Sequence, residues 1–178
     1  SLFSVLTGVS VALGYGLLGA TWLVWKTEGS VQLRARKMAA MLGLATIVAL
    51  IAVSLATPFL SIEYWHRWFE MPQMLLTAPV PLLVILCAVT MFRSLANDAE
   101  RLPFAMALCL FYLGFSGLGI SMFPNVVPPS ISIWDAAAPR DSQAFLLTGT
   151  VFILPVILAY TAWAYWVFRG KAGTKGYH

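Results

Sequence analysis

The side chains that could carry chemistry in this 178-residue chain lie between its apolar segments rather than within them. All seven acidic residues are in such connections, namely Glu28, Glu63, Glu70, Asp98, Glu100, Asp135 and Asp141. No Asp, Glu, Lys, Arg or His falls within the five apolar segments that we expect to span a membrane. Proton relays and ion pathways normally need such groups at membrane depth. The sequence therefore argues against a proton pump or ion-coupled transporter formed by this chain alone.

Haem ligation is the next chemistry to consider, because haem iron takes a His, Met, Cys or Tyr axial ligand. The two histidines are His66, which has aromatic neighbours, and His178, the last residue. A histidine among interfacial aromatic residues is ordinarily a surface residue, and nothing nearby indicates the enclosed pocket that haem requires. Cys87 and Cys109 are isolated in apolar segments and predict neither a disulfide framework nor a metal cluster.

The sequence contains no motif that is typical of a reaction centre. There is no Gly-rich phosphate loop, nucleophile elbow or metal-spaced cluster. We therefore predict no catalytic, cofactor-binding or metal-binding residue in this chain. The net charge of +4 would suggest acidic partners for a soluble protein, but membrane topology explains it better here. The expected partners include membrane lipid and exclude nucleic acid.

The elements that must position these residues are membrane helices. The chain is 60% hydrophobic and 10% charged, whereas charged residues make up about a quarter of a soluble domain. Apolar residues form blocks of about 20, the length that crosses a bilayer. Because lipid offers the backbone no hydrogen-bond partner, we predict an all-α integral membrane fold, a five-helix bundle in a single membrane domain over residues 1–178. The predicted spans are 2–25, 38–62, 73–92, 102–122 and 144–168, with an outer loop at 123–143.

The basic residues predict the orientation of these spans. Of the eleven, only Arg67 and Arg140 fall on one side, and nine fall on the other: Lys26, Arg34, Arg36, Lys37, Arg93, Arg101, Arg169, Lys171 and Lys175. The positive-inside rule then places the N-terminus outside and the C-terminus in the cytoplasm. Trp and Tyr residues at the inner ends of the first and last spans agree, because such rings favour the headgroup layer. We interpret them as interfacial anchors, with a quinone pocket as the alternative.

Prolines and small residues predict how the helices are shaped and packed. We expect Pro79 and Pro81 to kink or loosen the third span, and Pro103 to lie in a first helical turn. Pro155 should free a carbonyl near Val151, which Thr148 or Thr150 could satisfy. Stripes of small residues predict close helix approach: Gly8, Ala12, Gly16 and Ala20; Ala45, Ala49, Ala52 and Ala56; Gly114, Gly117 and Gly119.

The long connection from Phe123 to Gln143 is predicted to be a structural cover. Its prolines favour an extended path, and Ile131 and Ile133 alternate with serines, so that one side can pack on apolar surface. We expect Trp134 to insert as an anchor over the outer end of the bundle, and Asp135 to cap a short turn that follows it.

Two sequence blocks carry a family resemblance. The first reads Gly14-Tyr15-Gly16-Leu17-Leu18-Gly19-Ala20-Thr21-Trp22-Leu23, followed by Lys26-Thr27-Glu28-Gly29. The second includes Pro128-Pro129-Ser130, Ile133-Trp134-Asp135-Ala136-Ala137, Ser142-Gln143-Ala144-Phe145-Leu146 and Tyr165-Trp166-Val167-Phe168-Arg169-Gly170. In this order, with matching spans between them, the blocks resemble subunit II of cytochrome bd-type quinol oxidases, most closely the branch called cyanide-insensitive. The resemblance covers essentially the whole chain, as the C-terminal part of that subunit.

The resemblance implies a heterodimeric respiratory complex in the bacterial plasma (inner) membrane. Such a complex oxidises quinol, reduces dioxygen to water and contributes to the proton motive force. Haem b, haem d and the quinol-oxidation loop belong to subunit I. Subunit II supports subunit I, ligates no haem and in some members holds a structural quinone.

The family also implies a longer chain than this one. Subunit II supplies part of a proton route through carboxylates in an N-terminal half, whose four spans are not in this sequence. Since the chain starts Ser-Leu-Phe without an initiator Met, we expect it to be a fragment or a processed part of a larger subunit.

Two other functions are weighed against the resemblance. A small multispan transporter or permease would use the proline-broken third and fifth spans to line a substrate site. A haem-carrying electron-transfer protein would need His66 as an axial ligand.

Overall fold

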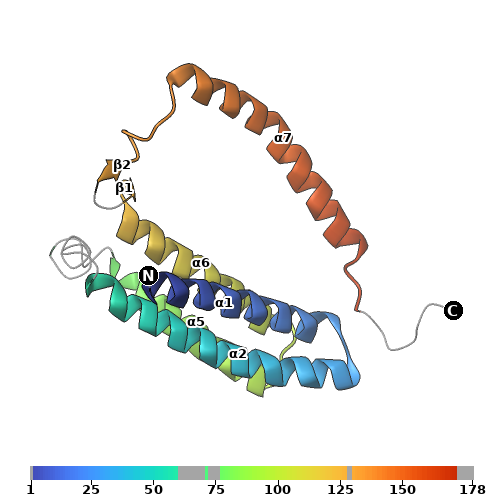
Figure 1. Ribbon diagram of the computed structural model, residues 1–178. Coiled ribbons are helices and arrows are strands. Elements are labelled where there is room, and N and C mark those ends of the chain that lie inside the picture. The colour runs from blue at the N-terminus through green and yellow to red at the C-terminus, as the bar shows by residue number, and fades with distance from the viewer. Residues whose placement is uncertain (1, 60–70, 72–76, 128–129, 172–178) are drawn as a thin grey trace. The chain divides into compact units, whose positions relative to one another are not determined.

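The computed structural model describes residues 2–59, 71, 77–127 and 130–171. These residues form long helices and one short hairpin (Figure 1). The elements in chain order are α1 (Leu2–Lys26), α2 (Gly29–Ala56), η1 (Thr57–Phe59), α5 (Pro79–Ala96), α6 (Leu102–Met122), β1 (Asn125–Val127), β2 (Ile131–Ser132) and α7 (Arg140–Val167).

Five of these helices are long and apolar enough to cross a membrane, which confirms the predicted all-α membrane fold. α1 and α6 match the predicted spans to within one residue. α2 begins at Gly29, well before the predicted start at residue 38, and α7 begins at Arg140. Both helices extend through polar residues beyond their apolar stretches. A helix need not stop at the hydrocarbon edge, because long basic side chains can carry their charge to water.

The two prolines of the third span lie in the first turn of a helix. α5 starts at Pro79 and ends at Ala96, later than the predicted 73–92, and residues 73–76 lie outside the described chain. Proline suits a first turn because the missing N–H would have no partner there. The prediction that Pro79 and Pro81 kink or loosen the third span therefore stays a prediction. Pro103 lies in the first turn of α6, as predicted.

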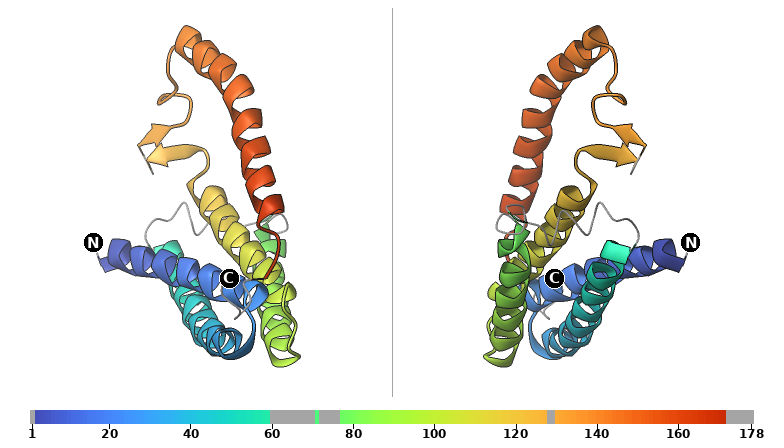
Figure 2. Two further views of the ribbon diagram at one scale, coloured as in Figure 1. Left: turned by 90° about the vertical axis from the view of Figure 1, so that its right-hand side faces the viewer. Right: turned by 90° about the vertical axis from the view of Figure 1, so that its left-hand side faces the viewer.

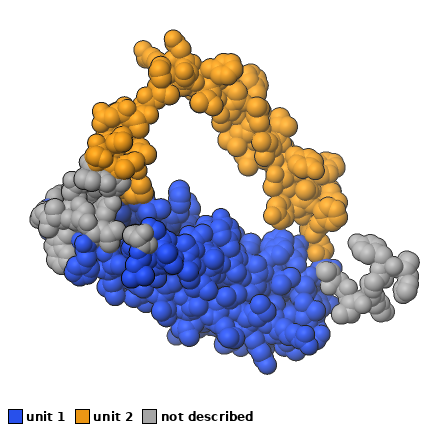
Figure 3. All heavy atoms as spheres, viewed as in Figure 1, with its two compact units in different colours: residues 1–121, 171–178 blue, residues 122–170 orange. Residues whose placement is uncertain are grey.

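The described chain divides into two compact units, coloured separately in Figure 3. Unit 1 contains the described residues up to Ser121 together with Lys171. Unit 2 runs from Met122 to Gly170 and contains the hairpin and α7. The single membrane domain over residues 1–178 stays a prediction.

Unit 1 is a helix bundle whose buried core gathers toward one end. α1 and α2 run side by side in opposite directions (Figures 1 and 2). The core cluster consists of Leu17, Ala20, Ala39, Met91, Leu95, Ala107 and Leu110. In α1 the buried residues begin only at Gly14, and in α5 only at Met91. The tightest packing is therefore near the α1–α2 and α5–α6 connections.

The predicted small-residue stripes are only partly the packing faces. In α1, Ala20 is buried and Gly16 packs against Leu42, whereas Gly8 and Ala12 are exposed. In α6, Gly114 lies against a leucine, but a Cβ at Gly117 or Gly119 would meet nothing within 4 Å. The buried face of α1 instead comprises Gly14, Leu17, Ala20, Thr21 and Val24.

Unit 2 begins with an antiparallel hairpin in which Asn125 pairs with Ser132 and Val127 with Ile131. Asp135 Oδ2 accepts hydrogen bonds from the backbone N–H and hydroxyl of Ser132, at 3.3 and 2.5 Å. Asp135 thus closes the turn before it, because Ser132 offers two nearby donors, and not the turn after it as predicted.

The predicted anchor Trp134 is 67% exposed in this unit. Its ring makes an edge contact with Phe123, 6.2 Å between centroids. Within the described residues of unit 2, the Trp134 side chain is therefore not buried as an anchor. The prediction that the connection covers the outer end of the bundle concerns the two units together and stays a prediction.

α7 continues through Pro155, which lies inside the helix. The hydroxyls of Thr148 and Thr150 donate to the carbonyls of Ala144 and Leu146, at 2.9 and 2.8 Å. Each threonine thus bonds one turn back along its own helix. Neither hydroxyl donates a hydrogen bond to the carbonyl of Val151, contrary to the prediction.

Candidate functional site

The α1–α2 and α5–α6 connections meet at the same end of unit 1 (Figure 1). Gly29 and Asp98 take left-handed conformations in them, with φ of 65° and 56°. Asp tolerates this region better than most residues, and Gly adopts it freely. We call this cluster the charged end and define it by Trp22, Trp25, Lys26, Glu28, Gln32, Arg36, Asp98, Glu100, Arg101, Phe104 and Lys171.

Arg36 connects α2 to the C-terminus of α5. Its Nη1 donates to the carbonyl oxygens of Leu95 and Ala99, at 2.9 and 3.3 Å, and its Nε lies 3.5 Å from Asp98 Oδ1. The Arg36 side chain is only 14% exposed. The last carbonyls of a helix lack intrahelical donors and carry partial negative charge, so a guanidinium satisfies both their hydrogen bonding and their electrostatics.

Glu100 receives polar contacts from two parts of the chain. Gln32 Nε2 donates to Glu100 Oε1 at 3.3 Å and to the carbonyl of Val24 at 3.0 Å. Lys171 Nζ donates to the same carboxylate oxygen at 2.6 Å and lies 3.5 Å from Glu28 Oε1. The hydrogen bond from Lys171, then that from Gln32, lowers the pKa of Glu100. The same contact with Glu100 raises the pKa of Lys171.

The charged end also contains three aromatic rings that contact one another. Trp22 and Trp25 contact each other edge-on at 5.1 Å between centroids, and both contact Phe104, at 5.0 and 5.8 Å. The Lys26 ammonium lies 5.1 Å from the Trp22 ring centre and 5.0 Å from that of Trp25. The Arg101 guanidinium lies 6.0 Å from the Trp25 ring centre. These distances fall in the range of cation–π attraction.

The contacts of the charged end can hold helix ends in place. Within the described residues, no group of three or more His, Cys, Asp or Glu is placed to hold a metal ion. The two histidines that could ligate haem iron, His66 and His178, lie outside the described residues. The sequence predicted no site residue, and that prediction stays untested.

Sequence reasoning missed the inward position of Arg36, although a signal was present. Gln32, Arg36, Ala39 and Gly43 recur at three- and four-residue spacing along α2. Ala39 and Gly43 are buried, so this spacing puts Arg36 on the packed face of the helix.

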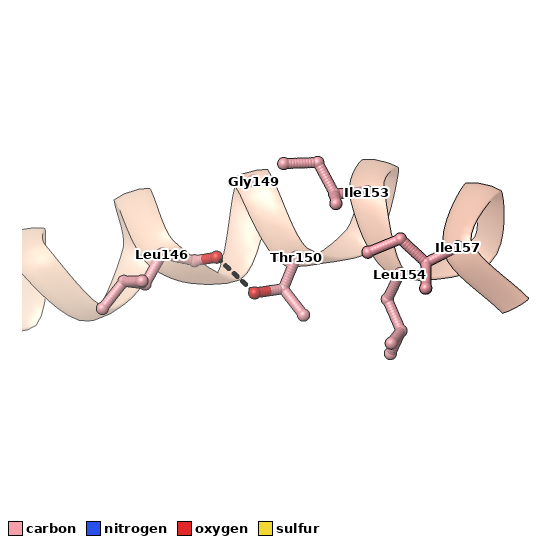
Figure 4. A pocket seen from close by; sticks show the side chains of 6 residues that line it. All are labelled: Leu146, Gly149, Thr150, Ile153, Leu154 and Ile157. Atoms are coloured by element: carbon pink, nitrogen blue, oxygen red, sulfur yellow. Dashed lines mark hydrogen bonds between the residues drawn. The ribbon is translucent and has the colours of Figure 1, made fainter.

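α7 presents a second candidate surface, a shallow apolar hollow along one helix face (Figure 4). Its lining residues recur at helical spacing and are Leu146, Gly149, Thr150, Ile153, Leu154 and Ile157. Gly149 and Thr150 are small, which leaves a notch between the larger aliphatic side chains (Figure 4). The hydroxyl of Thr150 is already bonded to the Leu146 carbonyl. The hollow therefore suits helix packing better than recognition of a polar ligand.

The C-terminal end of α7 carries its own aromatic and basic cluster. The rings of Trp163 and Trp166 lie 6.0 Å apart. The Arg169 guanidinium lies 4.6 Å from the Trp166 ring centre and donates to the Trp166 carbonyl at 3.1 Å. This pairing suits the headgroup layer of a membrane, where an indole ring and a basic side chain are both favoured.

Comparison with known proteins relates the chain to respiratory oxidases. The family model described as "Cytochrome bd terminal oxidase subunit II" matches residues 1–168. "Cytochrome bd ubiquinol oxidase subunit 2" of Bacillus subtilis (strain 168) is 24% identical, over 98% of this chain and 52% of its own length. "Cytochrome bd-I ubiquinol oxidase subunit 2" of Escherichia coli (strain K12) is 27% identical, over 95% and 52%. The chain thus spans about half the length of these relatives.

Proposed function

Because the chain belongs to the cytochrome bd terminal oxidase subunit II family, we propose that it forms part of the non-haem-ligating subunit of a bd-type quinol oxidase. The complex would couple the oxidation of quinol to the reduction of dioxygen to water in an aerobic respiratory chain. The family match over residues 1–168 is the observation that carries this proposal.

In this proposal, haem b and haem d are held by a partner, subunit I, and this chain supports that partner within the membrane. The contacts of the charged end favour a structural role, because Arg36, Gln32 and Lys171 hold helix ends in place. Quinol is a substrate of the complex. No catalytic residue is assigned to this chain.

Purification through a tag on this chain tests the proposal. A second membrane subunit that carries haem should co-purify with it, and the preparation should show a haem d absorbance and oxidise quinol with consumption of dioxygen. Membranes lacking this chain should lose the haem d absorbance, and reintroducing the wild-type chain should restore it. Unchanged spectra and unchanged oxidase activity in membranes that lack this chain would contradict the proposal.

We also propose the orientation that the basic residues predict, with the charged end in the cytoplasm and the hairpin of unit 2 outside. Two exposed positions give a matched pair for labelling, Asn97 after α5 and Ser130 in the hairpin connection. In intact cells a membrane-impermeant maleimide should label Ser130→Cys and spare Asn97→Cys, which should react only after permeabilisation. The reverse pattern would invert the orientation.

The transporter alternative depends on prolines that break the third and fifth membrane helices. At the fifth span, α7 continues through Pro155, which argues against that alternative. Broken helices are the feature that lines substrate sites in such transporters.

A further inference from the structure

We propose that Cys87 and Cys109 form a dithiol inside the membrane, which a lipid-soluble quinone oxidises to a disulfide that links α5 to α6. The sequence predicted no disulfide framework, and both cysteines are free thiols in the structure. The proposed oxidase function gives these two side chains no role, and the inference does not depend on that function.

The contact between the two thiols carries the inference. Cys87 belongs to α5 and Cys109 to α6, and their side chains form a hydrogen bond with each other. A thiol is only a weak donor and a weak acceptor, so such a bond requires two sulfur atoms that lie next to each other. Two reactive groups from different helices are therefore neighbours.

The packing of α5 against α6 keeps these thiols together. Met91 of α5 belongs to the same buried core cluster as Ala107 and Leu110 of α6. Cys87 lies one turn before Met91 and packs against that cluster. Cys109 lies between the two α6 residues along the chain. The core thus holds both helices at the level of the two thiols.

Both thiols lie at a similar distance from the connection that joins α5 to α6. At a rise of roughly 1.5 Å per residue, Cys87 lies about 14 Å before the end of α5 at Ala96, and Cys109 about 10 Å after the start of α6 at Leu102. Half of the hydrocarbon layer of a bilayer is about 15 Å thick. In a membrane that these helices cross, both thiols therefore lie within the hydrocarbon.

This position favours an oxidant that arrives through the lipid. Cys87 is half-buried, whereas Cys109 is exposed on the surface of α6, next to the exposed Leu108. A charged oxidant such as oxidised glutathione is excluded at this depth, because moving its charges out of water is unfavourable. A neutral quinone dissolves in the bilayer and can reach Cys109 from there.

The reaction balances with the quinone as the oxidant. The two S–H bonds break and one S–S bond forms, while two electrons and two protons pass to the quinone, which becomes a quinol. The dithiol and the disulfide are both neutral, so neither form leaves a charge in the hydrocarbon. Thiols in apolar surroundings react slowly. We therefore expect oxidation over minutes to hours rather than seconds.

Peptide mapping provides the test, because trypsin cuts after Arg93 and Arg101, between the two cysteines. Isolated membranes that contain the chain and its accompanying subunits are reduced with dithiothreitol, washed and incubated with decylubiquinone, whose fully substituted ring offers no position for thiol addition. Free thiols are then blocked with N-ethylmaleimide before digestion. We expect the Cys87 and Cys109 peptides to appear in mass spectra as one linked species that a reductant separates, with loss of the two blocked peptides. Oxidised glutathione should give no linked species.

The double variant Leu108→Cys, Cys109→Ser is the matched control. It keeps two thiols at nearly the same depth but moves one of them around α6 by one residue, so it should give no linked species. Equal linkage in this variant would overturn the proposal in favour of chance collisions between lipid-exposed thiols. Absence of linkage in the wild type with decylubiquinone, or equal linkage with oxidised glutathione, would also overturn it. The haem d absorbance and the oxidase activity test the proposed function separately.

Discussion

Arg36 Nη1 donates a 2.9 Å hydrogen bond to the carbonyl oxygen of Leu95, which joins the first third of α2 to the last turn of α5. Leu95 belongs to the buried core, as does Ala39, one turn along α2 from Arg36. The polar contact and the apolar packing therefore support each other. This link joins helices that are distant in the sequence.

Replacing Arg36 by Gln should destabilise the protein, because the carbonyls of Leu95 and Ala99 would lose a charged donor. Hydrogen bonds to charged groups contribute roughly 1.5–3 kcal/mol, and partial exposure should bring the loss to about 1–2 kcal/mol. Thermal unfolding in detergent measures it. Arg34→Gln, at an exposed position of the same helix, is the control and should change the midpoint little. Equal midpoints for both variants would contradict the assigned role.

Gly43 lies at a close contact between α2 and α5. A Cβ at this position would lie 2.8 Å from the terminal methyl of Met91, a fully buried side chain. Gly43→Leu should therefore overpack the core and cost roughly 1–3 kcal/mol. Gly8→Leu is the control, because a Cβ there meets no atom within 4 Å and the position is exposed.

A second measurement identifies the cause of the Gly43 effect. If the clash with Met91 is responsible, adding Met91→Ala should recover part of the stability lost in Gly43→Leu. A double-mutant cycle from thermal unfolding gives this coupling. Additive losses from the two changes would show that crowding against Met91 is not the cause.

The sequence allowed the helices to be predicted, because a block of about 20 apolar residues has few alternatives in a membrane. It did not allow their packed faces to be predicted. α1 has small residues at Gly8, Ala12 and Gly16, yet its buried face is centred on Leu17 and Thr21. In a helix that is apolar all round, periodicity does not separate the packed face from the lipid-facing one. The packed face is decided by the helix that packs against it, which for α1 is mainly α2.

The candidate site was equally difficult to predict, for a related reason. In the sequence, the basic residues of the charged end indicate only membrane topology. The contact between Lys171 and Glu100 joins residues that are 71 positions apart, and that between Arg36 and Leu95 spans 59. Composition and local spacing carry no information about such pairs. The position of Arg36 on the face of Ala39 was the one local clue.

Thr46 in α2 is a position where a substitution should not lower the stability of the fold. Within the described part of the chain, its hydroxyl oxygen is buried and makes no hydrogen bond. An unsatisfied buried hydroxyl costs free energy, and valine has nearly the same shape without that group. Thr46→Val should therefore leave the unfolding midpoint unchanged or raise it. Thr21→Val is the comparison, because the Thr21 hydroxyl donates to the Leu17 carbonyl at 2.8 Å. A larger loss for Thr46→Val than for Thr21→Val would contradict this reading.

The pair Glu100–Lys171 should make stability depend on pH at both extremes. Lys171 lowers the pKa of Glu100 below its usual 4.5, so the pair stabilises the fold above that pH. The contribution is lost as the pH falls through the lowered pKa. Glu100 in turn raises the pKa of Lys171 above 10.5, so the contribution is complete below that pH and is lost as the pH rises through the raised pKa.

Glu100→Gln tests this dependence, because glutamine cannot titrate. Thermal midpoints of the wild type and the variant should differ most between the two pKa values and converge in acid. The difference should be small and should shrink in high salt, since the Glu100 and Lys171 side chains are 40% and 32% exposed. Glu28→Gln, which removes the longer 3.5 Å contact with Lys171, should lower the midpoint less. A Glu100→Gln difference that persisted unchanged into acid would show that lost packing, and not the ion pair, is responsible.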